Sequence, residues 1–177
     1  MKKLKNLLRA IPIKTVLSVL LLAVICATVY LTAGQRDRLV SELPGYKTLV
    51  EAENGSIFSG KMKYAEYRYE KVPLSQLEEN DNFAVVDYET LETLQNCLSD
   101  YGKRIEDYLE NGSSKNRELA LKYNFDPSAL SEGDYCYLTV NESEDGKTVT
   151  EYTVYYFDLS EKTLYYFYSE NEFKIKS

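Results

Sequence analysis

The feature that most restricts how this chain can fold is an uninterrupted stretch of uncharged residues near its N-terminus. Residues 15–35 read TVLSVLLLAVICATVYLTAGQ and contain no acidic or basic side chain. As an α-helix, these residues would span about 31 Å, which matches the hydrocarbon core of a bilayer. A buried helix of a soluble protein normally carries a polar stripe, whereas this stretch has only scattered Ser and Thr. The sequence therefore predicts a transmembrane helix at 15–35.

The charges that flank this stretch predict its orientation in the membrane. The residues before it include five Lys or Arg and no acid, whereas both signs of charge follow it directly. Positively charged flanks remain on the cytoplasmic side of a membrane. We therefore expect four parts: a short basic cytoplasmic tail at 1–14, a signal anchor at 15–35, a juxtamembrane segment at 36–46 and an extracytoplasmic domain at 47–177.

Two processing events are alternatives to a retained anchor. A cleaved signal peptide normally has an apolar core of about 7–15 residues, and the core here, Val16–Leu31, is longer. A cut after Gly34 would still leave small residues at the cleavage site. Lipoprotein processing at Cys26 is disfavoured because the large, branched Ile25 precedes the cysteine. Cys26 is then simply one apolar residue of the membrane segment.

Composition excludes several classes of chemistry for the outer part of the chain. The chain has 21 Lys or Arg, 28 Asp or Glu and no His. Because five of the basic residues precede the anchor, the part that follows it has a net charge of −12. This acidity argues against a nucleic-acid partner. The absence of histidine excludes Ser-His-Asp triads, Cys-His dyads and His-ligated zinc or haem. We expect no cofactor and no metal site.

The clearest helix of the outer domain is expected at Tyr88–Glu110. Apolar residues recur there at steps of three and four, which gives the helix one apolar face. Asp87 is a suitable N-cap, and Asn111-Gly112 is a typical helix end. A shorter helix is expected at 115–123, and Asp126-Pro127 should begin a single helical turn.

The C-terminal part predicts an antiparallel meander of three strands. The runs 134–140, 149–158 and 163–169 are rich in β-branched and aromatic residues, and polar turns join them. Upstream, Asn54-Gly55 predicts a tight hairpin turn between strands at 48–53 and 56–61. The stretch Met62–Val72 fits both a strand and a helix, and we interpret it as a strand.

These elements predict an α+β fold class for the whole chain. An N-terminal transmembrane helix would precede an extracytoplasmic domain, in which a long amphipathic helix packs on an antiparallel, Tyr-rich β-sheet. The arrangement is similar to that of cystatin-like folds. This similarity is one of architecture and implies no function.

Tyrosine is unusually abundant, at 17 of 177 residues, and is concentrated in the predicted strands. Alternation along 134–140 places Cys136 and its neighbours Leu138 and Val140 on one face, and Tyr135 and Tyr137 on the other. If the long helix covers the first face, Tyr135 and Tyr137 would belong to a surface suited to binding glycan or polypeptide. Two structural alternatives remain: the N-terminal strands cover this second face, or paired tyrosines only stabilise the sheet.

Two cysteines of the outer domain, Cys97 on the long helix and Cys136 on a strand, both point toward the predicted core. A disulfide between them would close a loop of about 40 residues, and an exported domain permits it. The alternative is two ordinary buried thiols. We expect no catalytic role for either cysteine, because there is no histidine to activate a thiol.

The sequence therefore predicts a single-pass membrane-anchored protein that contacts the lipid bilayer through residues 15–35. Its extracytoplasmic domain would serve binding or assembly with a protein partner in the membrane or envelope, without catalysis. The alternative is an exported carboxylate-dependent hydrolase of the glycosidase type, which needs two carboxylates across a sugar. The candidate acids for that alternative are Glu78-Glu79-Asp81 and Glu142-Glu144-Asp145, which lie on polar segments.

Overall fold

The computed structural model describes residues 38–54, 60–144 and 148–174. The chain divides into two compact units, Met1–Glu42 and Leu43–Ser177. Helix α3 (Arg38–Glu42) belongs to the first unit, and all other described elements belong to the second. The predicted transmembrane helix, with Cys26, lies outside the described residues. Within the described ranges, no helix is both long enough and apolar enough to cross a bilayer.

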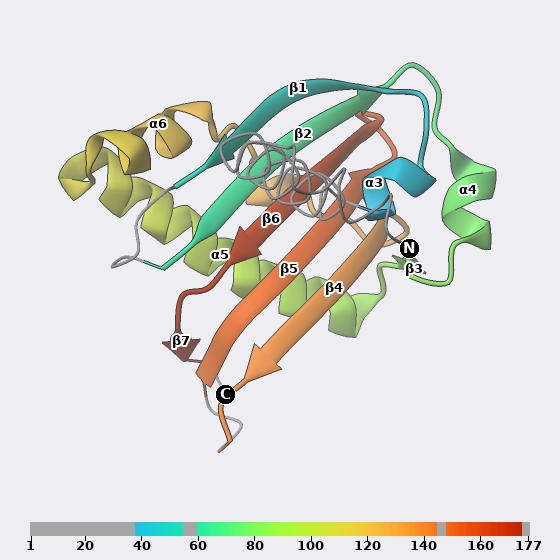
Figure 1. The fold of residues 1–177 in the computed structure, drawn as a ribbon. Coiled ribbons are helices and arrows are strands. Elements are labelled where there is room, and N and C mark those ends of the chain that lie inside the picture. The colour runs from blue at the N-terminus through green and yellow to red at the C-terminus, as the bar shows by residue number, and fades with distance from the viewer. Residues whose placement is uncertain (1–37, 55–59, 145–147, 175–177) are drawn as a thin grey trace, which may run out of the picture. The chain divides into compact units, whose positions relative to one another are not determined.

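The second unit is built around one seven-stranded antiparallel sheet (Figure 1). The sheet has the order β1-β2-β6-β5-β4-β3, and β7 pairs with β5. Its strands are β1 (Tyr46–Glu53), β2 (Met62–Tyr69), β3 (Ala84–Val85), β4 (Tyr135–Glu142), β5 (Thr148–Asp158), β6 (Thr163–Ser169) and β7 (Phe173–Lys174). The predicted meander is confirmed as β4, β5 and β6. The short strands β3 and β7 were not predicted.

Helix α5 (Tyr88–Asn111) confirms the predicted long helix and is unbroken. It begins at Asp87, whose side chain accepts a hydrogen bond of 2.8 Å from the Thr90 N–H. It ends at Gly112, whose N–H donates to the Tyr108 carbonyl. A Cβ at Gly112 would lie 2.4 Å from that carbonyl oxygen, so this close approach requires glycine.

Three shorter helical elements complete the unit. Helix α6 (Ser114–Lys122), capped by Ser113, and the 3₁₀ turn η1 (Pro127–Ala129), capped by Asp126, confirm two predictions. Helix α4 (Leu74–Glu79) was not predicted, and only its Leu77 is buried. Its six residues are too few for a clear apolar repeat, which explains why the sequence pattern missed it.

The core lies between α5 and one face of the sheet, which we call the proximal face (Figure 1). The opposite face is called the distal face. The predicted alternation is confirmed, because Cys136 is buried in this core and Leu138 and Val140 pack at its border. The largest fully buried side chains of the core are Tyr64, Tyr101, Tyr152, Tyr156 and Phe167.

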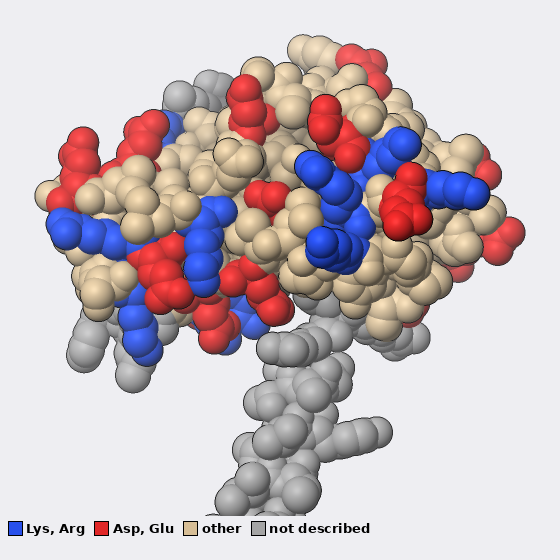
Figure 2. Space-filling view, turned by 90° about the horizontal axis from the view of Figure 1, so that it is seen from above, with Lys and Arg blue, Asp and Glu red and all other residues tan. Residues whose placement is uncertain are grey.

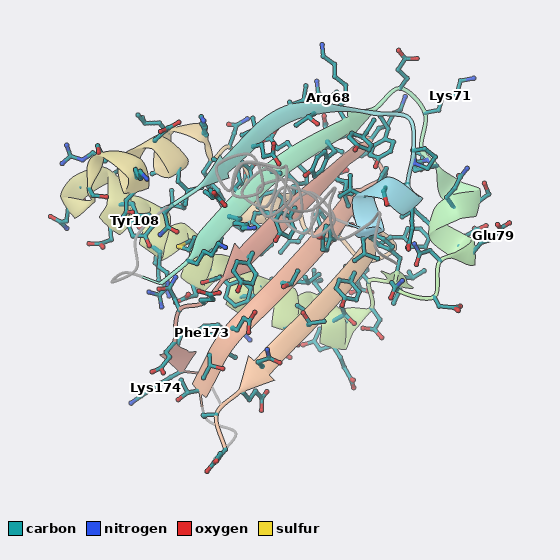
Figure 3. The ribbon with its side chains drawn as sticks, viewed as in Figure 1. Arg68, Lys71, Glu79, Tyr108, Phe173 and Lys174 are labelled. Atoms are coloured by element: carbon teal, nitrogen blue, oxygen red, sulfur yellow. The ribbon has the colours of Figure 1, made fainter. Side chains whose placement is uncertain are left out.

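The strand predicted at 56–61 lies mostly outside the described residues. The predicted pairing across Asn54-Gly55 was wrong, because the partner of β1 is β2, which begins at Met62, and the loop 54–61 joins the two strands. Asn54 is buried and closes this loop: its N–H donates to the Met62 carbonyl, and its Oδ1 accepts from the Met62 N–H. Its Nδ2 lies 3.0 Å from the Gly60 carbonyl and 3.0 Å from the hydroxyl of Tyr108 on α5 (Figure 3). These bonds join the end of β1 to the start of β2 and to α5.

A pair of alanine substitutions tests the placement of α5. Leu98 is fully buried in the middle of its apolar face, so Leu98→Ala should lower the free energy of unfolding by about 2–5 kcal/mol. Glu92 is exposed on the same helix, and Glu92→Ala should change that free energy by less than about 0.5 kcal/mol. Chemical denaturation measures both values. Equal losses for the two variants would contradict this placement.

Candidate binding surface

The tyrosines of the proximal face are structural. The Tyr101 hydroxyl on α5 donates to the Lys63 carbonyl on β2 over 2.8 Å. In the reverse direction, the Tyr152 hydroxyl on β5 donates to the Cys97 carbonyl on α5 over 3.0 Å. Burial raises the pKa of both phenols well above the ordinary value, because their ionised forms would lose the solvation of water. These side chains tie the helix to the sheet and present no surface to a ligand.

The distal face carries a second set of tyrosines, which forms a row across three neighbouring strands. Tyr137 on β4 lies opposite Tyr155 on β5, which lies opposite Tyr166 on β6. The ring centroids are 5.9 Å apart in the first pair and 4.7 Å apart in the second, both with tilted planes. Tyr137 and Tyr166 are half-buried, whereas Tyr155 between them is 5% exposed. We call these three residues the tyrosine row.

The two sides of the tyrosine row differ in exposure. Toward the end of β5, the distal face is closed by buried Phe157, whose ring is 5.2 Å from that of Tyr69. On the other side, the next residues across the sheet are Thr139, Thr153 and Tyr168, none of them buried. Part of the side-chain surface therefore remains accessible on this second side, where the Tyr168 hydroxyl donates to Glu170.

The two candidate binding residues predicted from the sequence, Tyr135 and Tyr137, differ in their exposure to solvent. Tyr135 is 9% exposed, while Tyr137 is half-buried and belongs to the tyrosine row. Tyr166 and Tyr168 complete the surface and were missed as candidates, because the register between β5 and β6 is not encoded in either strand alone. The alternative that the N-terminal strands cover the distal face was wrong, since β2 pairs with β6 and extends the same sheet.

Cys97 and Cys136 lie in the proximal core as buried free thiols. Burial raises the pKa of the Cys97 thiol to about 12 and that of the Cys136 thiol to about 11. At neutral pH neither side chain is a thiolate, which is the form that attacks electrophiles or binds metal. The arrangement therefore gives these cysteines the role of core residues.

The acids named for a hydrolase that the structure describes are exposed. Glu79 points away from the sheet on α4 (Figure 3), Glu78 and Asp81 beside it are also exposed, and Glu142 ends β4. Asp145 lies outside the described residues. Glu144 lines an open depression of about 440 Å³ together with Glu172. Its other lining residues are Ser143, Thr148 and Thr150. Since both carboxylates are exposed to water, this depression lacks the shielding that a glycosidase gives its acid.

Three buried carboxylates were not foreseen: Glu66, Asp134 and Asp158. Tyr64 donates to Glu66, Tyr156 donates to Asp134, and Asp158 accepts from the backbone N–H groups of Ser160 and Glu161. Each therefore has a structural partner. The alternation of β2 could have placed Glu66 on the same face as Tyr64, which is the one signal the sequence offered.

The distribution of charges and of possible metal ligands bears on which kind of ligand the described surface could bind. Figure 2 shows basic and acidic side chains intermixed over one side of the molecule, with no extended basic patch among the residues described there. Among the described residues, no three His, Cys, Asp or Glu side chains are placed to hold a metal ion. Among the described residues, the accessible side of the tyrosine row is the surface best suited to a ligand.

No protein-family model, curated protein or solved structure matches this chain.

Thiol titration tests the state of the two core cysteines. In a Cys26→Ala variant of the chain, neither Cys97 nor Cys136 should react with a thiol reagent at about pH 8, because their raised pKa values leave almost no thiolate. Unfolding in urea should expose two reactive thiols. A chain that has no reactive thiol in urea until a reductant is added would instead contain the Cys97–Cys136 disulfide.

Proposed function

We propose that this chain is a single-pass membrane-anchored protein whose extracytoplasmic domain binds or assembles with a protein partner in the membrane or envelope. The accessible side of the tyrosine row, with Tyr168, would form the contact. The domain would act by binding and not by catalysis. The partner is described by its chemistry: a polypeptide surface able to stack on aromatic rings and hydrogen-bond to their hydroxyls.

The observation that carries the proposal is the difference between two sets of tyrosines, one sealed between α5 and the sheet and one partly exposed on the distal face. On the proximal face, Tyr101 and Tyr152 are almost fully buried and their hydroxyls are bonded to backbone carbonyls. On the distal face, Tyr137 and Tyr166 keep part of their surface exposed. Half-exposed tyrosines supply contact area with little loss of side-chain freedom on binding, which is why they are enriched at interfaces.

The N-terminal sequence supports an extracytoplasmic location for the domain. Residues 15–35 are long enough to cross a bilayer, and the basic residues before them favour a cytoplasmic N-terminus. The domain would then lie outside the cytoplasm, joined to the anchor by a short segment.

A carboxylate-dependent exported hydrolase is the second candidate function. The observation in its favour is the depression lined by Glu144 and Glu172. Its weakness is that both acids are exposed, whereas a general acid is normally held in an apolar environment.

Cross-linking on intact cells tests the orientation and the surface together. A membrane-impermeant amine-reactive cross-linker, added outside, should join the full chain to its partner. Tyr137→Ala and Tyr166→Ala should each lower the cross-linked yield by about tenfold, as expected for loss of an interface ring worth about 1.4 kcal/mol. Thermal unfolding should meanwhile remain cooperative.

The matched control is Tyr88→Ala, because Tyr88 is 71% exposed at the start of α5 and lies off the distal face. Its cross-linked yield should equal that of the unmodified chain. Equal yields for all three variants would contradict the tyrosine surface. A chain that reacts only after the cells are broken would contradict the orientation.

A further inference from the structure

Strand β4 forms one edge of the sheet and is only partly covered (Figure 1). The two-residue strand β3 pairs with Tyr135 and Cys136 at its start. Among the described residues, no strand pairs with the remainder of this edge. We propose that two copies of this chain associate by antiparallel pairing of their β4 strands, which joins two sheets into one. The contact would be made by the backbone edge of β4 and not by the rings of the tyrosine row, so the inference goes beyond the proposed function and does not rest on it.

The backbone direction along β4 identifies the groups that a second copy would meet. The Val86 N–H donates to the Asp134 carbonyl over 2.7 Å, so Asp134 directs its carbonyl toward the β3 side. Alternate residues of a strand direct their N–H and C=O groups to the same edge. Leu138 and Val140 therefore present their backbone groups at the uncovered edge, beyond the end of β3.

The two edges of the sheet differ in their protection against such pairing. The other edge strand, β1, carries Lys47, Glu51 and Glu53 and is interrupted by a bulge between Thr48 and Val50. Charges and bulges are the devices by which natural sheets prevent edge-to-edge association. In contrast, β4 has no charged residue from Tyr135 to Asn141. The unprotected edge of this sheet is therefore β4.

The available length of β4 sets the register. Its uncovered regular part is Tyr137–Asn141, bounded by β3 at one end and by an irregularity between Asn141 and Glu142 at the other. The midpoint of this part is Thr139. A two-fold axis through Thr139 places Leu138 opposite Val140 of the second copy, and both residues direct their backbone groups outward. The pairing is therefore self-complementary, as an isologous dimer requires.

Side chains and charges agree with this register. Leu138 and Val140 are half-buried on the proximal side, so pairing would cover further apolar surface. The nearest charge on the strand, Glu142, would lie about 20 Å from its equivalent, which is beyond the screening length in physiological salt. The net negative charge of the domain is therefore not concentrated at this contact.

Site-specific disulfide formation tests the register. Thr139 is exposed, and at a two-fold axis its Cα would lie about 4.5 Å from its equivalent, close enough for a disulfide. The full chain carrying Cys26→Ala and Thr139→Cys should therefore form a disulfide-linked species of twice the chain mass under mild oxidation. Adding Val140→Pro removes an outward N–H and should abolish this species, while circular dichroism shows that the fold remains.

The matched control is Thr48→Cys in the same background, because Thr48 is an exposed threonine on the distal face of the other edge strand. Its linked species should be about tenfold less abundant, since a disulfide needs Cα atoms within about 7 Å. Equal linkage at the two positions, or none at Thr139→Cys in a folded chain, would overturn the proposal.

Discussion

The position of α5 on the sheet depends on tyrosine hydroxyls that must find acceptors after burial. Tyr101 reaches from the helix to the Lys63 carbonyl, and Tyr152 reaches from the sheet to the Cys97 carbonyl. A buried hydroxyl left without a partner would destabilise the fold by about 1–3 kcal/mol. Because a shift of α5 on the sheet would break both hydrogen bonds, they hold the helix in its position on the strands. Tyr123, whose hydroxyl is buried without a partner among the described residues, is the exception. The rings provide buried apolar surface, and the hydrogen bonds of the hydroxyls determine where α5 packs on the sheet.

This use of tyrosine gives the two faces of the sheet different properties. On the proximal face, helix α5 covers the rings and leaves them no role outside the core. On the distal face, the tyrosine row stabilises the sheet through ring contacts, while Tyr137 and Tyr166 keep part of their surface exposed. Pairing of two β4 strands would place both distal faces on the same side of one sheet. Two binding surfaces would then act together, which raises the apparent affinity for a partner that is itself repeated.

The sequence was sufficient to predict those elements whose structure follows from a local repeat of apolar residues. The apolar repeat and the cap at Asp87 defined α5, and alternation defined the two faces of β4. The sequence was insufficient where a residue contacts another that lies far away along the chain. Asn54 resembled the start of a tight turn, but its side chain bonds Gly60 and Tyr108, and neither contact is visible in a local motif. For the same reason, Tyr137 was found as a candidate and Tyr166 was not, because only the registers on both sides of β5 place the two residues in one row, with Tyr155 between them.

The central claim is that one set of tyrosines is sealed against water and another is accessible. Burial raises the pKa of Tyr101 and Tyr152 well above 10.0, and burial with the nearby Glu66 and Asp158 carboxylates raises that of Tyr165 to about 12. The folded chain therefore holds these protons more tightly than the unfolded chain, so stability falls as pH rises above 10.0. Ultraviolet titration of tyrosinate should show a class of tyrosines that ionises only as circular dichroism shows unfolding. A single class that ionises near the ordinary pKa, with the fold intact, would contradict the account.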